Sequence, residues 1–193
     1  MKPALLLVDL QRHFLDGPGL SPAPNELIDG VAKLLTACRD HGLLVLHAHT
    51  LVRPDGSDRM PHWKRAGAWA CIEGSPDCLP PPVLLPREGE LVFRKRFFSA
   101  FGNPDLDNTL VASGVDTLII AGLYLHACVR SSVMDAYEHG YEVWLADEAV
   151  ATTDPVHGEL TRGFLEGRAA TCLSNAAILE RLGAMDVNRC LLT

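Results

Sequence analysis

Runs of apolar residues recur along the chain, and several of them are unbroken rather than alternating. They cover residues 4–8, 43–49, 90–93, 117–122 and 142–146, with a shorter run near 170–173. Unbroken apolar runs are typical of strands that are covered on both faces, as in parallel sheets. Each run is therefore predicted to form a buried strand.

Segments with a helical spacing of apolar residues separate these runs. Leu27, Val31, Leu34, Leu35 and Cys38 fall on one face of a helix that is predicted to stop at Gly42. Further helices are predicted over 104–114, 127–140, 155–170 and 174–183, the last with Ser174 as its N-cap. Strands that alternate with such helices imply right-handed crossovers, so we expect a three-layer α/β/α, Rossmann-like open sheet, mostly parallel, of about six strands.

Composition and charge narrow the class of protein. The chain has 193 residues, 48% of them hydrophobic, which predicts a single domain over 1–193. A net charge of −7 and the lack of a basic stripe predict no nucleic-acid partner. No apolar run reaches the roughly 18 residues that a membrane helix needs, and the N-terminal run is too short for a secretory signal. A cytoplasmic protein with no membrane partner is expected.

The cysteines and one long polar segment add further expectations. Six cysteines form no CxxC pair, so we expect mostly reduced thiols. Residues 51–88 are rich in Pro and Gly and contain Trp63 and Trp69. A segment of this length in a compact domain is usually functional or disordered, and its two tryptophans favour packing.

Three residues whose side chains can take part in catalysis each follow a predicted strand. They are Asp9, Lys95 and Cys128. In open α/β sheets, ligands bind beyond the carboxyl ends of the strands, so these three are the candidates for a shared site.

Each candidate also has an ordinary structural explanation. Cys128 is predicted near a helix start, where the helix dipole favours the thiolate, but it is also a small residue that packs well. Asp9 ends a buried strand and needs a partner or a proton, yet it could merely cap a loop. Lys95 should point away from Arg94 and Arg96 by strand alternation, although a solvated basic edge is the simpler interpretation.

Taken together, the three segments resemble the isochorismatase-like hydrolases, also called cysteine hydrolases. The matching motifs are Asp9, Gln11 and Phe14 in DLQRHF; Lys95, Ser99, Ala100 and Phe101 in KRFFSAF; and Gly122, Cys128 and Val129 in GLYLHACV. The similarity continues through DAYEHGYEV and RPDGSD and covers nearly the whole chain.

The resemblance implies a catalytic arrangement for these residues. Cys128 would be the nucleophile, Asp9 the proton acceptor and Lys95 its cationic partner, acting through a covalent acyl intermediate. It also implies a cis peptide at Leu123–Tyr124 and an oxyanion hole made by the backbone amides of Tyr124 and Cys128. Candidate substrate-binding side chains are Phe14, Trp69, Phe97, Tyr124 and His126, with Phe98 as a further possible pocket residue.

The chain also departs from the family pattern. Tyr124, Leu125 and His126 stand where many members have a small residue and Thr, which predicts a bulkier pocket floor. Metal-dependent members carry an Asp-x-His pair, for which the nearest equivalents are His47 and His49, with His62 further on. Because no acidic residue stands in the expected place, we predict no metal and no cofactor.

The presence of Cys128 favours hydrolysis of a C–N bond in a small amide, carbamoyl or ureido substrate, because isochorismatases proper usually lack that cysteine. Two alternatives stay open at this point: an isochorismatase-type ether hydrolase, and a catalytically silent binding or redox-sensing protein. The resemblance also implies a homo-oligomer, either a dimer or a tetramer.

Overall fold

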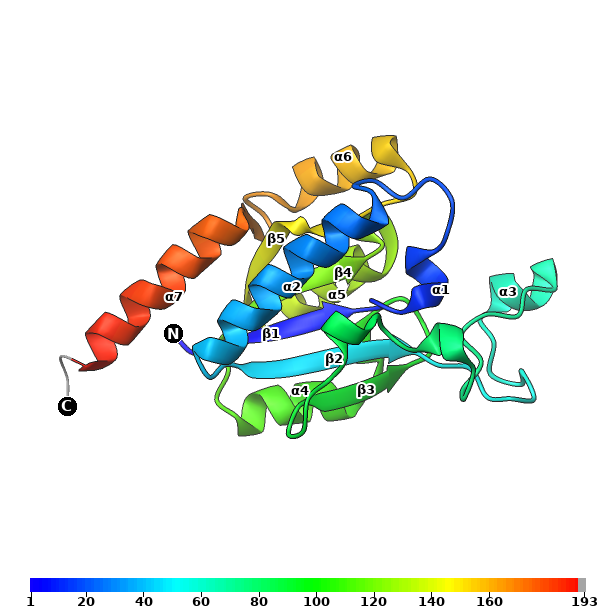
Figure 1. Ribbon diagram of the computed structural model, residues 1–193, viewed down its shortest axis with the longest axis horizontal. Coiled ribbons are helices and arrows are strands. Elements are labelled where there is room, and N and C mark those ends of the chain that lie inside the picture. The colour runs from blue at the N-terminus through cyan, green and yellow to red at the C-terminus, as the bar shows by residue number, and fades with distance from the viewer. Residues whose placement is uncertain (191–193) are drawn as a thin grey trace.

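The computed structural model describes residues 1–190, with side chains described through residue 185. Its centre is a parallel sheet of six strands in the order β3-β2-β1-β4-β5-β6 (Figure 1). The strands are β1 (Pro3–Val8), β2 (Leu44–Thr50), β3 (Leu91–Lys95), β4 (Thr117–Leu123), β5 (Glu142–Ala151) and β6 (Thr171–Leu173). This confirms the predicted fold class, and the six apolar runs supply the six strands.

Helices cover both faces of the sheet (Figure 1). On one face lie α2 (Pro24–Asp40) and α7 (Asn175–Cys190), and on the other α4 (Pro104–Ala112) and α5 (Arg130–Glu138). The remaining helix of comparable length, α6 (Pro155–Leu165), packs against the turn that precedes α5. Two apolar clusters, one on each face, form the core.

The long polar segment is ordered into short elements. It contains α3 (Pro61–Ala66) and the 3-10 turns η1 (Pro76–Cys78) and η2 (Pro82–Leu84), while the short α1 (Arg12–Leu15) follows β1. Val52 and Ile72 form a bridge that ties the segment to itself. The packing that the two tryptophans indicated is therefore present, although Trp69 itself is half exposed.

Two glycines let the backbone approach closely where a side chain would not fit. A Cβ atom at Gly122 would lie 2.0 Å from the carbonyl oxygen of Val8, and one at Gly30 would lie 2.1 Å from that of Glu148. Gly122 also has a φ of 128°, a conformation that favours glycine. These contacts set the spacing of β1 against β4 and of α2 against β5.

Element boundaries differ from the predictions in a few places. Strand β5 continues to Ala151, beyond the apolar run, and α6 ends at Leu165 rather than at 170. Ser174 caps the last helix as predicted, because its Oγ accepts a hydrogen bond from the Ala177 amide. Among the described residues, no helix is long and apolar enough to cross a membrane.

Candidate active site

The carboxyl ends of four neighbouring strands meet at one edge of the sheet. Asp9 follows β1, Thr50 ends β2, Lys95 ends β3 and Cys128 lies beyond β4. The register pairs Thr50 with Lys95 and Val8 with both Ala48 and Gly122, so these strand ends are level with one another. Residues that are far apart in the sequence therefore arrive at the same place.

Asp9, Lys95 and Cys128 lie in direct contact. The Lys95 Nζ is 2.7 Å from Asp9 Oδ2 and 3.4 Å from Cys128 Sγ. Asp9 and Lys95 are each 1% exposed and Cys128 is 6% exposed. The backbone of Asp9 has a φ of 54°, which is uncommon outside glycine but tolerated by Asp and turns the residue out of its strand.

Thr50 connects the acid and the amine, and sequence reasoning missed it. Its hydroxyl donates a hydrogen bond to Asp9 Oδ1 (2.8 Å) and accepts one from Lys95 Nζ (2.8 Å), while its amide donates to the same Asp9 oxygen (2.9 Å). Gln11, already part of the first motif, exchanges two 2.9 Å bonds with the Thr50 backbone. The backbone carbonyl of Phe97 accepts a further bond from Lys95 Nζ at 3.0 Å.

The charges of the site keep Lys95 protonated and Cys128 neutral. Burial acts to lower the pKa of Lys95, but the nearby Asp9 and Cys128 outweigh it, so the pKa lies above its ordinary value. Burial and the charge of Asp9 raise the pKa of the Cys128 thiol, against the opposing effect of Lys95. The resting group is a thiol beside a carboxylate that can accept its proton.

The surroundings of Cys128 differ from the predicted helix start. Cys128 belongs to a π-helical turn, η4 (Leu125–Val129), and α5 begins two residues later at Arg130. The expectation that the helix dipole makes the free thiol more acidic does not hold, because burial and Asp9 have the larger, opposite effect on its pKa. The peptide between Leu123 and Tyr124 is cis, as the family resemblance implied.

Three of the predicted substrate-binding side chains lie together beside the site. The Tyr124 hydroxyl donates a hydrogen bond to the Phe14 carbonyl (3.2 Å), and the two rings meet edge to face at 5.8 Å. Burial, followed by the charges of Cys128 and Asp9, raises the pKa of Tyr124 to about 12, so it is a neutral phenol. His126 stacks on Tyr124 at 5.9 Å, and its Nδ1 is bonded to Thr152 Oγ1.

The other predicted aromatic side chains lie on the surface. Trp69 is 57% exposed and packs against Gly56 and under the guanidinium of Arg59. The Phe97 side chain is 47% exposed, so its link to the site is through its carbonyl. Phe98 is also largely exposed and stacks on His62.

The histidines near the second strand have other partners. His47 Nε2 lies 3.0 Å from Glu90, which is also held by Arg39. Burial, followed by the charge of His47, lowers the pKa of His49 to about 4. Within the described residues, no group of three or more His, Cys, Asp or Glu side chains is arranged to hold a metal ion.

The five cysteines whose side chains are described are free thiols, and the side chain of Cys190 lies outside that set.

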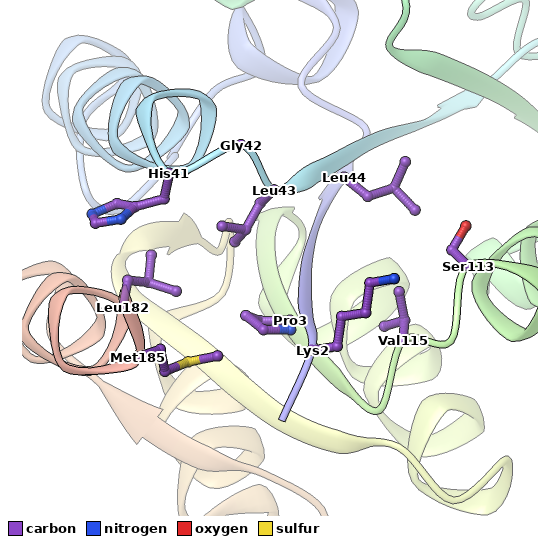
Figure 2. A pocket seen from close by; sticks show the side chains of 10 residues that line it. All are labelled: Lys2, Pro3, His41, Gly42, Leu43, Leu44, Ser113, Val115, Leu182 and Met185. Atoms are coloured by element: carbon purple, nitrogen blue, oxygen red, sulfur yellow. The ribbon is translucent and has the colours of Figure 1, made fainter. Parts of the chain in front are cut away.

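A separate cavity lies at the opposite end of the sheet and contributes nothing to this site. Figure 2 shows it between the start of β1 at Lys2 and Pro3, the start of β2 at Leu44, and Met185 of α7. Its volume is about 90 Å³. Ligand sites of open α/β sheets lie at the carboxyl ends of the strands, which is where Asp9, Lys95 and Cys128 are.

The fold and the site together define an α/β protein with a buried carboxylate, ammonium and thiol at the strand ends. The sequence matches the family model of the isochorismatase domain over residues 3–177. The chain belongs to the isochorismatase family.

Individual relatives agree with this assignment. Maleamate amidohydrolase of Pseudomonas putida is 32% identical over 171 residues, which cover 82% of this chain and 78% of that protein. The crystal structure of an isochorismatase family protein from Desulfovibrio vulgaris has a TM-score of 0.83 and 31% identity, covering 94% of this chain and 98% of the other. N-carbamoylsarcosine amidase from Thermoplasma acidophilum has a TM-score of 0.76 and 28% identity, covering 91% and 97%.

Proposed function

We propose that this protein hydrolyses a C–N bond in a small amide, carbamoyl or ureido compound, using Cys128 as nucleophile and no cofactor. The observation that carries the proposal is the position of Lys95 Nζ, within 2.7 Å of Asp9 and 3.4 Å of Cys128. A buried ammonium that contacts both a carboxylate and a thiol can stabilise the charge that forms when the proton moves between them.

The reaction begins with proton transfer. Asp9 takes the proton of Cys128, and the resulting thiolate attacks the carbonyl carbon of the substrate. The negative charge on the carbonyl oxygen is held by the backbone amides of Tyr124 and Cys128, and one such donor is worth roughly 3 kcal/mol in the transition state. The C–N bond then breaks, and Asp9 returns the proton to the departing nitrogen.

Water completes the cycle. Asp9, again a carboxylate, takes a proton from a water molecule whose oxygen attacks the thioester carbon. Collapse of the second tetrahedral species breaks the C–S bond and releases the acid, and the proton returns from Asp9 to the sulfur. Lys95 stays protonated throughout, since its charge offsets the carboxylate and thiolate in turn.

The relatives support cleavage of C–N bonds. One is named a maleamate amidohydrolase and another an N-carbamoylsarcosine amidase. In this chain, we propose that Phe14, Tyr124 and His126, which contact one another near Cys128, form one side of the substrate site, and that the long segment 51–88 forms the other. We therefore place the substrate between these two segments.

The test is an ammonia-release screen of carboxamides, carbamoyl and ureido compounds with the wild-type protein and Cys128→Ala. For an accepted substrate, we expect Cys128→Ala to lose about 10⁴-fold in kcat, and intact-mass analysis of the wild type to reveal an acyl adduct during turnover. Cys172→Ala, which removes a half-buried thiol from β6, is the matched control and should keep full activity. Ammonia release that persists in Cys128→Ala would exclude the mechanism, and ether cleavage without ammonia would favour the isochorismatase-type reaction.

A further inference from the structure

A second cavity, of about 400 Å³, lies outside the sheet beyond the ends of β2 and β3. Asp9, Lys95 and Cys128 are not among the residues that line it. We call it the arginine cavity, and the residues that line it are Arg53, Asp58, Arg94, Arg96, Gly102, Asn103 and Pro104.

The arginine cavity concentrates positive charge on a chain whose net charge is −7. Three guanidinium groups line it, and Asp58 is the single carboxylate among its lining residues. Asp58 Oδ2 lies 2.8 Å from Arg94 Nη2 and 4.0 Å from Arg53 Nε. Glu73, which does not line the cavity, accepts a hydrogen bond from the other terminal nitrogen of Arg94 at 3.2 Å. Arg94 is therefore paired with two carboxylates, and Arg53 shares Asp58 with it through a longer contact. Within the described residues, Arg96 forms no ion pair with a carboxylate.

Arg53 and Arg96 keep donor groups available. Arg96 uses Nε to bond the backbone carbonyl of Asp58 at 3.0 Å, and its guanidinium lies 4.9 Å from the ring centre of Phe97. In the part of the chain that the structure describes, neither Arg53 nor Arg96 has a hydrogen-bond partner for its terminal nitrogens. The terminal nitrogens of Arg53 and Arg96 are therefore available to donate hydrogen bonds to a ligand in the arginine cavity.

We propose that the arginine cavity binds a phosphate group, either as inorganic phosphate or as part of a phosphomonoester. Paired guanidinium nitrogens match the spacing of phosphate oxygens and form bidentate, charge-assisted bonds with them. A phosphate near neutral pH carries a charge between −1 and about −2, which the guanidinium groups of Arg53 and Arg96 would offset. A ligand with one carboxylate group, in contrast, would leave one of these two arginines without a partner.

The position of the arginine cavity relates it to the buried site. Side chains alternate at the end of β3, so Arg94 in the strand and Arg96 just after it line the cavity, while Lys95, between them, contacts Asp9 and Cys128. The occupant is therefore either a remote phosphate on the substrate itself or a separate phosphate-bearing ligand. Both sources present the same chemistry to the arginines.

Binding is tested by titrating the full chain with inorganic phosphate and with phenyl phosphate in a calorimeter, at constant ionic strength. We expect saturable binding at one site, weakened at least tenfold in Arg53→Ala/Arg96→Ala and tightened in Asp58→Asn, which removes the competing carboxylate. Arg168→Ala, which removes an exposed arginine that lies over Phe164, is the matched control and should bind as the wild type does. Affinity that is unchanged in the double variant, or no saturable binding to the wild type, would overturn the proposal.

Repeating the titration in Cys128→Ala separates this inference from the proposed function, because phosphate binding should be unchanged there whether or not the protein is a hydrolase. Loss of binding in Cys128→Ala would assign the phosphate to the buried site and overturn the proposal. With an active substrate in hand, competitive inhibition by phosphate indicates that the substrate carries the group, and non-competitive inhibition indicates a separate ligand. Either pattern, if it is absent from the double variant, supports the arginine cavity as the binding site.

Discussion

Lys95 is an ammonium group buried at the end of a strand, and a charge in that position is costly unless it is paired and hydrogen-bonded. Its partners are Asp9, the Thr50 hydroxyl, the Phe97 carbonyl and the Cys128 sulfur. The pairing explains why the side chain is charged in the interior, and it ties the ends of four strands to one site.

Asp9 and Lys95 have opposing effects on the pKa of the Cys128 thiol. This gives an unusual prediction for Asp9, the proton acceptor. Asp9→Asn removes the charge that raises the pKa of Cys128 and leaves Lys95, which lowers it, in place. We expect iodoacetamide to alkylate Cys128 at neutral pH at least tenfold faster in this variant (order of magnitude), while amide hydrolysis is lost. Lys95→Met should slow alkylation, and Cys128→Ala identifies the labelled thiol. Slower labelling of Asp9→Asn than of the wild type would contradict the electrostatic argument.

Thr50 is predicted to position Asp9 and Lys95 rather than to touch the substrate. Thr50→Val keeps the shape and the backbone bonds but removes the hydroxyl that bridges the two groups. We expect kcat to fall about tenfold with little change in KM, because misplacing reacting groups raises the barrier. Thr50→Ser, which keeps the hydroxyl, should restore most of kcat. Equal losses in both variants, in step with a lower Tm, would indicate a purely structural role.

At the residue scale, the sequence predicts the site residues that stand out by their chemistry and position. It misses those whose role depends on which residues the fold brings beside them. Asp9, Lys95 and Cys128 stand out because each is chemically able and follows an apolar run. Thr50 ends a run like any other polar residue, and its role depends on the register of β2 against β3. The surface position of Trp69 depends on how residues 51–88 fold, which no periodic pattern specifies.

Helix α2 and strand β5 pack closely against each other, and Gly30 makes this contact possible. Gly30→Ala would place its Cβ 2.1 Å from the Glu148 carbonyl oxygen, so α2 would have to move. We expect a loss of roughly 3 kcal/mol in the free energy of unfolding, measured with urea. Gly163→Ala in α6 is the matched control, because its Cβ would meet nothing within 4 Å. It should raise stability by about 0.5–1 kcal/mol.

Elements were predicted well where periodicity is strong and less well where ends are set by packing. The apolar runs locate all six strands of the sheet. The extension of β5 to Ala151 could not be foreseen, because the polar pair Asp147 and Glu148 interrupts the pattern and the pairing resumes after an irregularity. A π-helical turn at Cys128 uses the same residue types as an α-helix, so the sequence does not distinguish them.

Across the whole molecule, Glu90 links α2, β2 and the loop before β3. It accepts hydrogen bonds from Arg39 (2.7 and 2.9 Å) and from the Arg87 amide (2.9 Å), and it lies 3.0 Å from His47. Burial would raise the pKa of this carboxyl, but the hydrogen bonds with Arg39 and the other donors lower it to about 2.

This depressed pKa makes stability depend on pH in a defined window. Above about pH 5, the folded and unfolded carboxyls are both ionised and the stabilisation is complete. It is lost as the pH falls from about 5 towards 2, because the unfolded chain takes up the proton first, and the loss amounts to at most about 3 kcal/mol. Urea unfolding across this range should show a smaller loss for Glu90→Gln than for the wild type. Parallel curves would rule out Glu90 as the cause.

The family assignment holds for nearly the whole chain, and the fold it implies is present. Assembly into a dimer or tetramer stays a prediction. Assembly depends on contacts between the surfaces of two copies, and no spacing of residues within one sequence specifies how these surfaces fit.

The alternation of side chains at the end of β3 places Lys95 on one side, and Arg94 and Arg96, the residue that follows the strand, on the other. Deleting a single residue within this strand would exchange their directions, turning a guanidinium inward and the amine outward. Evolution can therefore vary the loops around this strand in length, whereas the count of residues within it must stay fixed for either chemistry to survive.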